Sequence, residues 1–504
     1  MLTTRSMVSW VLFAGMAVPS IGMAAERAAC ESLTTAGLFS HTSITSARSI
    51  PADLSKSLPA YCEVTGSVTP VPGSKIGVVY RLPDSWNGKM LGLGGGGWAG
   101  NTTLAVATPG LVSGYATAQT NGGHDVDNVW DTSWASSPDA VTDFSYRAVH
   151  VMTDVGKAVV AKYYGRPQSR AYFQGCSTGG RQGLMEVQRF PNDYNGVVSG
   201  APVYSLTTQT MSLVRNKTFA HADANLTEAN LKYLNDAALA ACDAADGLKD
   251  GIVTDPRQCK FDPALAQCKD GAAGTDCLSR SQVAAVRSLY TGVRTSQGVP
   301  VSYALTRGSE VGWSRFISTG APPSSASYAN GTAGAGLGGL RALIFKDPDF
   351  DLAAFNPDRD YWTIRSSAFA KEYEAANPDI SAFVNAGGKL LLWHGFDDPG
   401  PSPLATLDYF HDVQKTTGPK VKSLDSSARL FLAPGVYHCR GGPGADQFDT
   451  VAALDQWVEK GEAPKQLLAT RADGAFSRPL CLYPALPRYD GKGDPKLAES
   501  FVCK

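Results

Sequence analysis

Residues 172–181 read Tyr-Phe-Gln-Gly-Cys-Ser-Thr-Gly-Gly-Arg and contain the pattern Gly-x-Ser-x-Gly centred on Ser177. A strand-like run, residues 170–174, precedes the pattern, and a helix-like run, residues 179–189, follows it. This order is typical of a nucleophile elbow, a sharp strand-to-helix turn with small residues on both sides of the serine. At such a turn the amide of Thr178 lies at a helix N-terminus, where it can stabilise an oxyanion. Because the chain has 52 glycines, the pattern alone does not decide between catalysis and a plain turn.

The composition is that of a globular protein. Of the 504 residues, 43% are hydrophobic and 18% are charged, and the chain is long enough for a large core or for one core with a substantial insertion. The formal net charge is -1. This near-neutral balance gives no electrostatic argument for nucleic acid or an anionic membrane as a partner.

Residues 1–25 have the pattern of a signal peptide. Arg5 supplies a basic start, residues 8–19 form an apolar run too short to span a bilayer, and residues 22–25 offer small residues for cleavage. We therefore expect a secreted or periplasmic protein without a membrane anchor.

The ten cysteines, an even number in an exported chain, predict disulfides, and no Cys-x-x-Cys pair indicates zinc or redox chemistry. Sequence cannot fix the connectivity, but proximity favours four pairs: Cys30–Cys62, Cys242–Cys259, Cys268–Cys277 and Cys481–Cys503. Cys176 and Cys439 are then left over.

Strand-like and helix-like runs alternate in two parts of the chain. The expected strands are residues 76–82, 89–93, 115–119, 170–174, 389–393 and 429–433, and the expected helices outside the elbow are 143–164, 403–415 and 446–460. Alternation with short loops predicts a parallel sheet flanked by helices. Residues 205–370 show helices mixed with Gly-, Ser- and Ala-rich stretches and few strands. We therefore predict a core in two parts, residues 26–204 and 371–504, with residues 205–370 inserted as a lid.

Two expected strand ends after the insertion carry the residues that a serine nucleophile needs. A serine requires a base, and the base requires a carboxylate that orients it; in α/β-hydrolases the chain order is Ser, Asp or Glu, then His. Asp397 and Asp398 follow the first of these strands, and His438 follows the second. Spacing does not decide between the two aspartates. His394 is a rival base, but it precedes the turn and is better placed to pack or to hydrogen-bond beneath the site.

The two remaining cysteines adjoin the candidate nucleophile and base. Cys176 precedes Ser177, and Cys439 follows His438. If the serine and the histidine meet, their neighbours also lie close, and a disulfide between them would clamp the site together. The predicted contact between Ser177 and His438 and the possible disulfide between Cys176 and Cys439 thus support the same arrangement of the two loops.

A glycine cluster, residues 94–97, directly follows the expected strand 89–93. Such a turn lets a backbone amide approach a ligand closely and often gives the second oxyanion donor of α/β-hydrolases. It lacks the Gly-x-Gly-x-x-Gly helix context of a dinucleotide site.

Residues 242–252, here called the aspartate loop, place three carboxylates among glycines. Hard oxygen ligands on a tight loop suit calcium, although the spacing is not that of an EF-hand. From spacing alone, an acidic turn is an equally good interpretation.

Taken together, these motifs resemble the tannase and feruloyl esterase family, which includes the hydrolase of mono(2-hydroxyethyl) terephthalate. The resemblance covers nearly all of the mature chain and rests on residues 122–125, 175–183, 189–191, 200–202, 394–399 and 438–444. It implies an α/β-hydrolase core with an inserted lid. It further implies Ser177 as nucleophile, His438 as base and Asp398 as the orienting acid.

The resemblance also implies details that the residues alone leave open. It places the oxyanion amides at Gly97 and Thr178, joins Cys176 to Cys439, and agrees with the four other cysteine pairs. It implies one structural calcium ion and no organic cofactor. The implied calcium ligands are the side chains of Asp243, Asp246 and Asp250 and the carbonyls of Leu248 and Ile252.

The family acts on esters of aromatic acids, which are small molecules, free or attached to plant cell-wall polysaccharide or polyphenol. Hydroxycinnamate esters are our first expectation, gallate esters the second and terephthalate monoesters the third. Trp313, Phe316 and Tyr328 are candidates for an aromatic wall of the pocket or for ordinary lid core. The alternative from another class is a catalytically silent, calcium-stabilised binding module. The intact Ser177, Asp398 and His438 argue against it.

Overall fold

The computed structural model describes residues 28–206, 214, 217–219, 222–269, 274–315, 337–351 and 354–504. The expected signal peptide, Phe316 and Tyr328 lie outside these ranges. None of the described helices combines the length and the apolar character that a membrane crossing needs.

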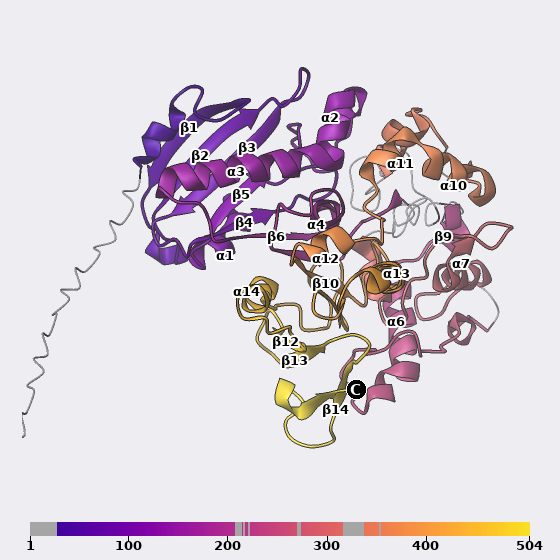
Figure 1. The fold of residues 1–504 in the computed structure, drawn as a ribbon. Coiled ribbons are helices and arrows are strands. Elements are labelled where there is room, and N and C mark those ends of the chain that lie inside the picture. Colours follow the sequence, from indigo (N-terminus) through magenta and orange to yellow (C-terminus); the bar gives the residue numbers. More distant parts are fainter. Residues whose placement is uncertain are drawn as a thin grey trace, which may run out of the picture.

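Within the described residues, a sheet of nine strands forms the centre of the molecule (Figure 1), in the order β1-β2-β3-β5-β4-β6-β7-β10-β11. Its strands are β1 (Thr42–Ile50), β2 (Tyr61–Val68), β3 (Ile76–Pro83), β4 (Lys89–Leu93), β5 (Ala116–Thr120), β6 (Arg170–Cys176), β7 (Gly196–Gly200), β10 (Lys389–Gly395) and β11 (Ala428–Ala433). The pairs β1–β2, β2–β3 and β3–β5 are antiparallel. The pairs β5–β4, β4–β6, β6–β7, β7–β10 and β10–β11 are parallel. The predicted mostly parallel sheet is confirmed.

The burial of the strands explains which of them the sequence predicted. All five residues of β5 and of β7 are buried, as are all but the first residue of β10, because helices cover both faces of this part of the sheet. Continuous apolar runs are typical of such strands, and β3, β4, β5, β6, β10 and β11 all fall where we predicted them. β1 alternates between exposed and part-buried residues, and β7 is a short run enclosed by glycines. Sequence analysis missed both, along with β2.

Helices on both sides of the sheet complete the core. They are α1 (Leu104–Val112), α2 (Pro138–Thr142), α3 (Ala148–Tyr164), α4 (Thr178–Arg189), α12 (Ser381–Asn385), α13 (Pro403–Thr417) and α14 (Thr450–Lys460). Local signals set several of their ends. Side-chain oxygens of Ser402 and Asp449 accept amide hydrogens at the starts of α13 and α14, and Gly165 in the left-handed region ends α3. The predicted helix 143–164 is confirmed, with a π-helical turn at Asp143–Arg147 before α3.

The described residues between β7 and β10 contribute no strand to the central sheet. Their elements include α6 (Glu228–Cys242), α7 (Arg280–Thr291), β8 (Val293–Arg294), β9 (Pro300–Ser302), α9 (Leu337–Gly339), α10 (Pro357–Ser366) and α11 (Ala368–Tyr373). Figure 1 shows α6, α7, α10 and α11 together on one side, away from β1 and β2. This is the arrangement expected of an insertion, while the boundaries at 205 and 370 stay predictions.

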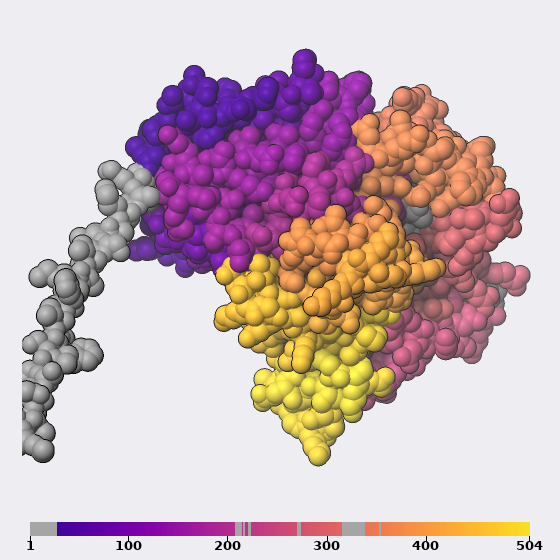
Figure 2. Space-filling model, in the orientation of Figure 1, coloured from indigo at the N-terminus to yellow at the C-terminus, as the bar shows by residue number. Residues whose placement is uncertain are grey.

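The inserted segment has two parts that pack differently. Residues between Phe219 and Trp313 form an apolar cluster of their own, whereas Leu340, Phe369 and Tyr373 share a cluster with Trp98 of the core. Trp313 is fully buried in the first cluster, so its indole is lid core and not a pocket wall. In the space-filling view (Figure 2) the orange residues accordingly lie directly against the purple ones.

The C-terminal segment adds two small hairpins outside the central sheet. They are formed by β12 (Gln466–Thr470) with β13 (Ser477–Cys481) and by β14 (Pro487–Tyr489) with β15 (Phe501–Cys503). Sequence analysis proposed no strands here, because the runs are short and interrupted by prolines. The disulfide Cys481–Cys503 ties the two hairpins together.

Candidate active site

Ser177 occupies the sharp turn between β6 and α4. Its φ of 62° is in the left-handed region, which a residue with a side chain adopts only where surrounding contacts hold it. The flanking glycines permit the turn. A Cβ on Gly175 would approach the backbone of Gly179 within 2.4 Å, and a Cβ on Gly180 would lie 2.3 Å from the carbonyl oxygen of Gly200. The predicted strained elbow is therefore present.

His438 lies between Ser177 and Asp398. Its Nε2 is 2.9 Å from the Ser177 hydroxyl oxygen, and its Nδ1 is 2.7 Å from Oδ2 of Asp398. Because a carboxylate only accepts, Nδ1 carries the hydrogen, and Nε2 is free to accept the serine proton. The structure thus brings together three side chains that follow β6, β10 and β11.

Asp398 and its neighbour Asp397 have opposite environments. Both are fully buried, and Asp398 accepts hydrogen bonds from the amide of Gly400, from His438 and from His394. Burial alone would raise the pKa of Asp398, but the charge of His438 and the hydrogen bonds of both histidines outweigh it and lower the pKa to about 2. Neither carboxyl oxygen of Asp397 accepts a hydrogen bond from a side chain of the described residues, and the backbone of Gly435 only partly offsets the burial that raises the pKa of Asp397 well above its usual range. Only Asp398 therefore contacts His438, which decides the choice that spacing left open.

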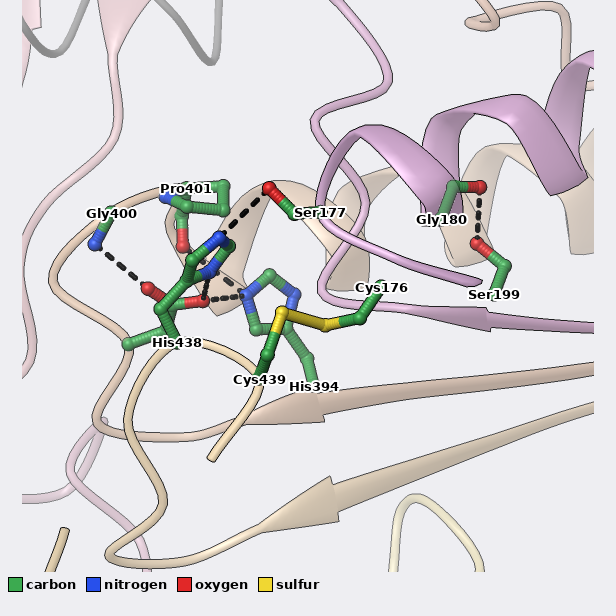
Figure 3. The surroundings of a disulfide bond; sticks show 10 residues. Cys176, Ser177, Gly180, Ser199, His394, Gly400, Pro401, His438 and Cys439 are labelled. Carbon is green, nitrogen blue, oxygen red and sulfur yellow. Dashed lines mark hydrogen bonds and ion pairs between the residues drawn. A yellow bond between two sulfur atoms is a disulfide. The ribbon is translucent and has the colours of Figure 1, made fainter. Parts of the chain in front are cut away.

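The disulfide Cys176–Cys439 lies beside these side chains, as Figure 3 shows. Its Cα atoms are 6.0 Å apart, and Cys439, like Ser177, has a left-handed φ, here 63°. The bond therefore fixes the two strained positions relative to each other. This pair and the other four predicted pairs, Cys30–Cys62, Cys242–Cys259, Cys268–Cys277 and Cys481–Cys503, are all confirmed.

Gly97 and Thr178, the expected oxyanion donors, are held side by side. The Thr178 hydroxyl donates to the Gly97 carbonyl oxygen at 2.6 Å, and Gly97 has a left-handed φ of 59°. Within the described residues, neither backbone amide donates a hydrogen bond. The Gln182 side chain, which sequence analysis did not single out, accepts from the Gly95 amide at 2.9 Å and so fixes the glycine cluster.

The aspartate loop has the donor types that a hard cation requires. Asp250 accepts from Arg478 through Oδ2 at 2.7 Å, while its Oδ1 is buried without a partner among the described residues. Burial raises the pKa of Asp243 and of Asp246, and the charge of Asp250 adds to both shifts. Three carboxylates facing one arginine leave an excess of negative charge that a divalent cation would neutralise. In this conformation Asp243 and Asp246 accept hydrogen bonds from amides of the loop itself.

A second acidic cluster, unnoticed in the sequence, joins α3 to the last turn of α4. It is the one set in the described chain whose three potential metal-ligating atoms lie within 4.8 Å of one another: His150, Glu186 and Asp193. His150 Nδ1 is 2.7 Å from Asp193, and Lys157 is 3.9 Å from it. Burial raises the pKa of Glu186 well above its usual range, and the charge of Asp193 adds to the shift.

Comparison with known proteins decides the family. The chain matches the family described as tannase and feruloyl esterase over residues 62–504. It is 35% identical to the mono(2-hydroxyethyl) terephthalate hydrolase of Piscinibacter sakaiensis, across 88% of this chain and 85% of that protein. It is also 35% identical to a probable feruloyl esterase of Arthroderma benhamiae, across 85% and 82%.

The chain belongs to the tannase and feruloyl esterase family. The crystal structure of feruloyl esterase B from Aspergillus oryzae matches with a TM-score of 0.83 and 27% identity, covering 94% of this chain and 99% of that one. The predicted α/β-hydrolase core is thus confirmed, and the protein is a carboxylic ester hydrolase of this family. The alternative of a silent binding module gains no support.

Proposed function

We propose that the protein is a secreted serine esterase that hydrolyses esters of aromatic acids through Ser177, His438 and Asp398. The observation that carries this proposal is the continuous hydrogen-bond chain from the Ser177 hydroxyl through both nitrogens of His438 to Asp398. A hydroxyl is a weak nucleophile at neutral pH, and this chain supplies the base that activates it.

The reaction proceeds in two balanced halves. The Ser177 oxygen attacks the ester carbonyl while its proton passes to Nε2 of His438, and Asp398 stabilises the resulting imidazolium. The tetrahedral oxyanion accepts hydrogen bonds from the amides of Gly97 and Thr178. The C–O bond to the alcohol then breaks, and the alcohol leaves with the proton from His438. Water repeats the sequence on the acyl-enzyme, with His438 as base, and releases the acid and free Ser177.

For the acyl group, esters of hydroxycinnamic acids such as ferulic acid are the first choice. Two relatives named above carry feruloyl esterase in their names, and the match to the Aspergillus oryzae structure spans nearly the whole chain. Gallate esters are the second choice. Terephthalate monoesters are the third, and the Piscinibacter relative is named for that reaction. Attachment of the substrate to plant cell-wall polysaccharide or polyphenol belongs to the same proposal.

A substrate panel combined with one substitution tests these assignments. We expect methyl ferulate to be hydrolysed faster than methyl gallate or a terephthalate monoester by the purified protein. Ser177→Ala should lose at least about 10⁴-fold in kcat and all labelling by a fluorophosphonate, because the nucleophile is gone. Ser426→Ala, an exposed serine before β11, is the matched control and should remain fully active. Substantial turnover by folded Ser177→Ala would refute the assignment.

We also propose that the aspartate loop binds one structural calcium ion. The side chains of Asp243, Asp246 and Asp250 and the carbonyls of Leu248 and Ile252 would hold it, and the ion would neutralise the carboxylates and cross-link the loop. In the described part of the chain, neither carbonyl accepts a hydrogen bond, and Asp250 Oδ1 is unpaired. Calorimetric titration of chelated protein with calcium should show one site, and its occupation should raise the Tm. The double variant Asp243→Asn/Asp246→Asn should bind no calcium; an unchanged isotherm would refute the site.

Secretion rests on the N-terminal pattern and on the five disulfides, which form in oxidising compartments. N-terminal sequencing of the exported protein should begin near residue 26. Retention of residue 1 in active extracellular protein would contradict the proposal.

A further inference from the structure

His394, at the C-terminal end of β10, is a second histidine on the carboxylate that contacts His438. Its side chain is completely buried, and its Nε2 is 3.0 Å from Oδ2 of Asp398, the same oxygen that His438 approaches at 2.7 Å. Figure 3 shows the two imidazoles next to each other beside the disulfide. A buried imidazole so close to the proposed site requires an explanation beyond packing.

The contacts of His394 fix which of its nitrogens carries a hydrogen. Nε2 faces two acceptors, the Asp398 carboxylate and the carbonyl oxygen of Pro401 at 3.1 Å, so Nε2 must donate. Nδ1 is 2.8 Å from the hydroxyl of Thr406, on the first turn of α13. The hydroxyl can donate to Nδ1, which stabilises the tautomer with its hydrogen on Nε2. The ring therefore has a hydrogen-bond partner at both ends.

Asp398 is consequently held from three directions. One carboxylate oxygen accepts from the amide of Gly400 at 2.7 Å, and the other accepts from the two imidazoles. Without such donors a buried carboxylate is free to rotate, and its protonated form is favoured; at the neighbouring Asp397, burial raises the pKa well above its usual range. The donor on His394 opposes both outcomes.

We propose that His394 is a positioning residue of the esterase, which keeps the Asp398 carboxylate oriented and ionised for His438. The inference rests on the proposed function, since it assigns His394 a part in the same triad. His394 does not touch Ser177 and takes no proton from it. It acts through Asp398: His394 donates a hydrogen bond to the carboxylate, and the carboxylate accepts a hydrogen bond from Nδ1 of His438.

If His394 has this role, loss of its donor should change the pH dependence of kcat/KM. A residue that only fills space would not cause such a change. The titratable groups that act on Asp398 are His394 and His438, and the adjacent Asp397 faces Glu310 of the inserted segment. Loss of the His394 donor makes the Asp398 carboxylate more basic, so that it binds a protonated His438 more strongly. The acid limb of the kcat/KM profile, which reports protonation of the free base, then moves to higher pH.

Three substitutions distinguish the effect of the hydrogen-bond donor on His394 from the effect of the volume of its ring. His394→Phe keeps a ring but removes the donor, and kcat should fall by about tenfold to a hundredfold, the size of one charge-assisted hydrogen bond. KM should change by less than about threefold, because His394 does not touch substrate. His394→Gln places an amide N–H near the position of Nε2 and should restore most of the lost rate. Thr406→Val, which only frees Nδ1, should lower kcat by about threefold to tenfold.

The acid limb should shift upward in His394→Phe, less in Thr406→Val and least in His394→Gln. A wild-type kcat and acid limb in folded His394→Phe would overturn the inference. If that variant does not fold, an unchanged kcat and acid limb in Thr406→Val overturns it instead. The proposed function fails separately, because it predicts an inactive Ser177→Ala whatever the His394 variants show.

Discussion

The turn after β10 places two adjacent carboxyls in two different regions of the molecule. Asp398 accepts hydrogen bonds from His394, His438 and the amide of Gly400, whereas the charge that acts on Asp397 is that of the buried Glu310 of the inserted segment. Burial raises the pKa of Asp397 well above its usual range, and the Glu310 charge adds to the shift, whereas the pKa of Asp398 is lowered to about 2. Equal burial therefore accompanies pKa shifts of opposite direction at two adjacent residues.

The difference shows that hydrogen-bond donors and a nearby positive charge can outweigh the effect of burial on the pKa of a carboxyl, as they do at Asp398. Glu310 is an intermediate case. It accepts from the hydroxyl of Tyr290 and the amide of Gly308, yet burial still raises its pKa to about 7. The pKa is therefore lowered at Asp398, whereas burial raises it at Asp397 and at Glu310.

The largest expected effect is the difference in kcat/KM between asparagine substitutions at positions 398 and 397. Asp398→Asn should lower kcat/KM by about 10⁴-fold, because an amide can donate to His438 and stabilise the wrong tautomer. Asp397→Asn should change kcat/KM by less than about threefold, since no catalytic group contacts it. Steady-state kinetics on both variants, with circular dichroism to verify folding, measure the contrast. Similar losses in the two variants would remove the distinction that we draw.

Removal of the disulfide at the triad should give the next largest effect. Cys176→Ala/Cys439→Ala loses a bond that closes a loop of 263 residues, which the chain-entropy model values on the order of 5 kcal/mol. We expect kcat to fall by about tenfold or more, because the two strained positions are no longer joined. Cys481→Ala/Cys503→Ala is the control and should lose stability without losing kcat in the protein that remains folded. Wild-type kcat in the first double variant would show that packing alone holds the site.

Glu310→Gln should give the smallest effect, seen only in the pH dependence of stability. The pKa of Glu310 is raised from 4.5 to about 7, so the folded protein holds a proton that the unfolded chain releases between these values. Stability from this group is present below pH 4.5 and is lost as the pH rises through about 7, on the order of 3 kcal/mol in total. Glu310→Gln should remove that decline and flatten the unfolding free energy between pH 4.5 and 7. An identical decline in both proteins would assign it to other groups.

Sequence patterns identified the parts of the fold whose signals are local. The apolar runs of β4, β6 and β10 and the glycines around Ser177 predicted the sheet and the elbow, because burial and turn geometry constrain residue type directly. β1 and β2 carry mixed polar and apolar residues, so their place at the sheet edge could not be read. The hairpins near the C-terminus were missed because their strands are short and interrupted by prolines.

The candidate active site shows a second limit of prediction from sequence. Chain order and family resemblance selected Ser177, Asp398 and His438, but spacing could not separate Asp397 from Asp398. Both side chains are buried at one turn, and only the path of the folded backbone decides which of them meets the histidine. Sequence analysis placed His394 beneath the site as a packing or hydrogen-bonding residue, but it could not name the partners, because the contacts with Asp398, Pro401 and Thr406 are made by folding.

The Cys176–Cys439 bond encloses the whole inserted segment within one covalent ring. Whatever conformation the enclosed residues adopt, the bond holds Cys176 and Cys439 together, with their Cα atoms 6.0 Å apart. The inserted segment can therefore vary in length or composition without separating nucleophile from base. In a protein built this way, an engineer could exchange the inserted segment as one unit while the neighbours of Ser177 and His438 stay joined.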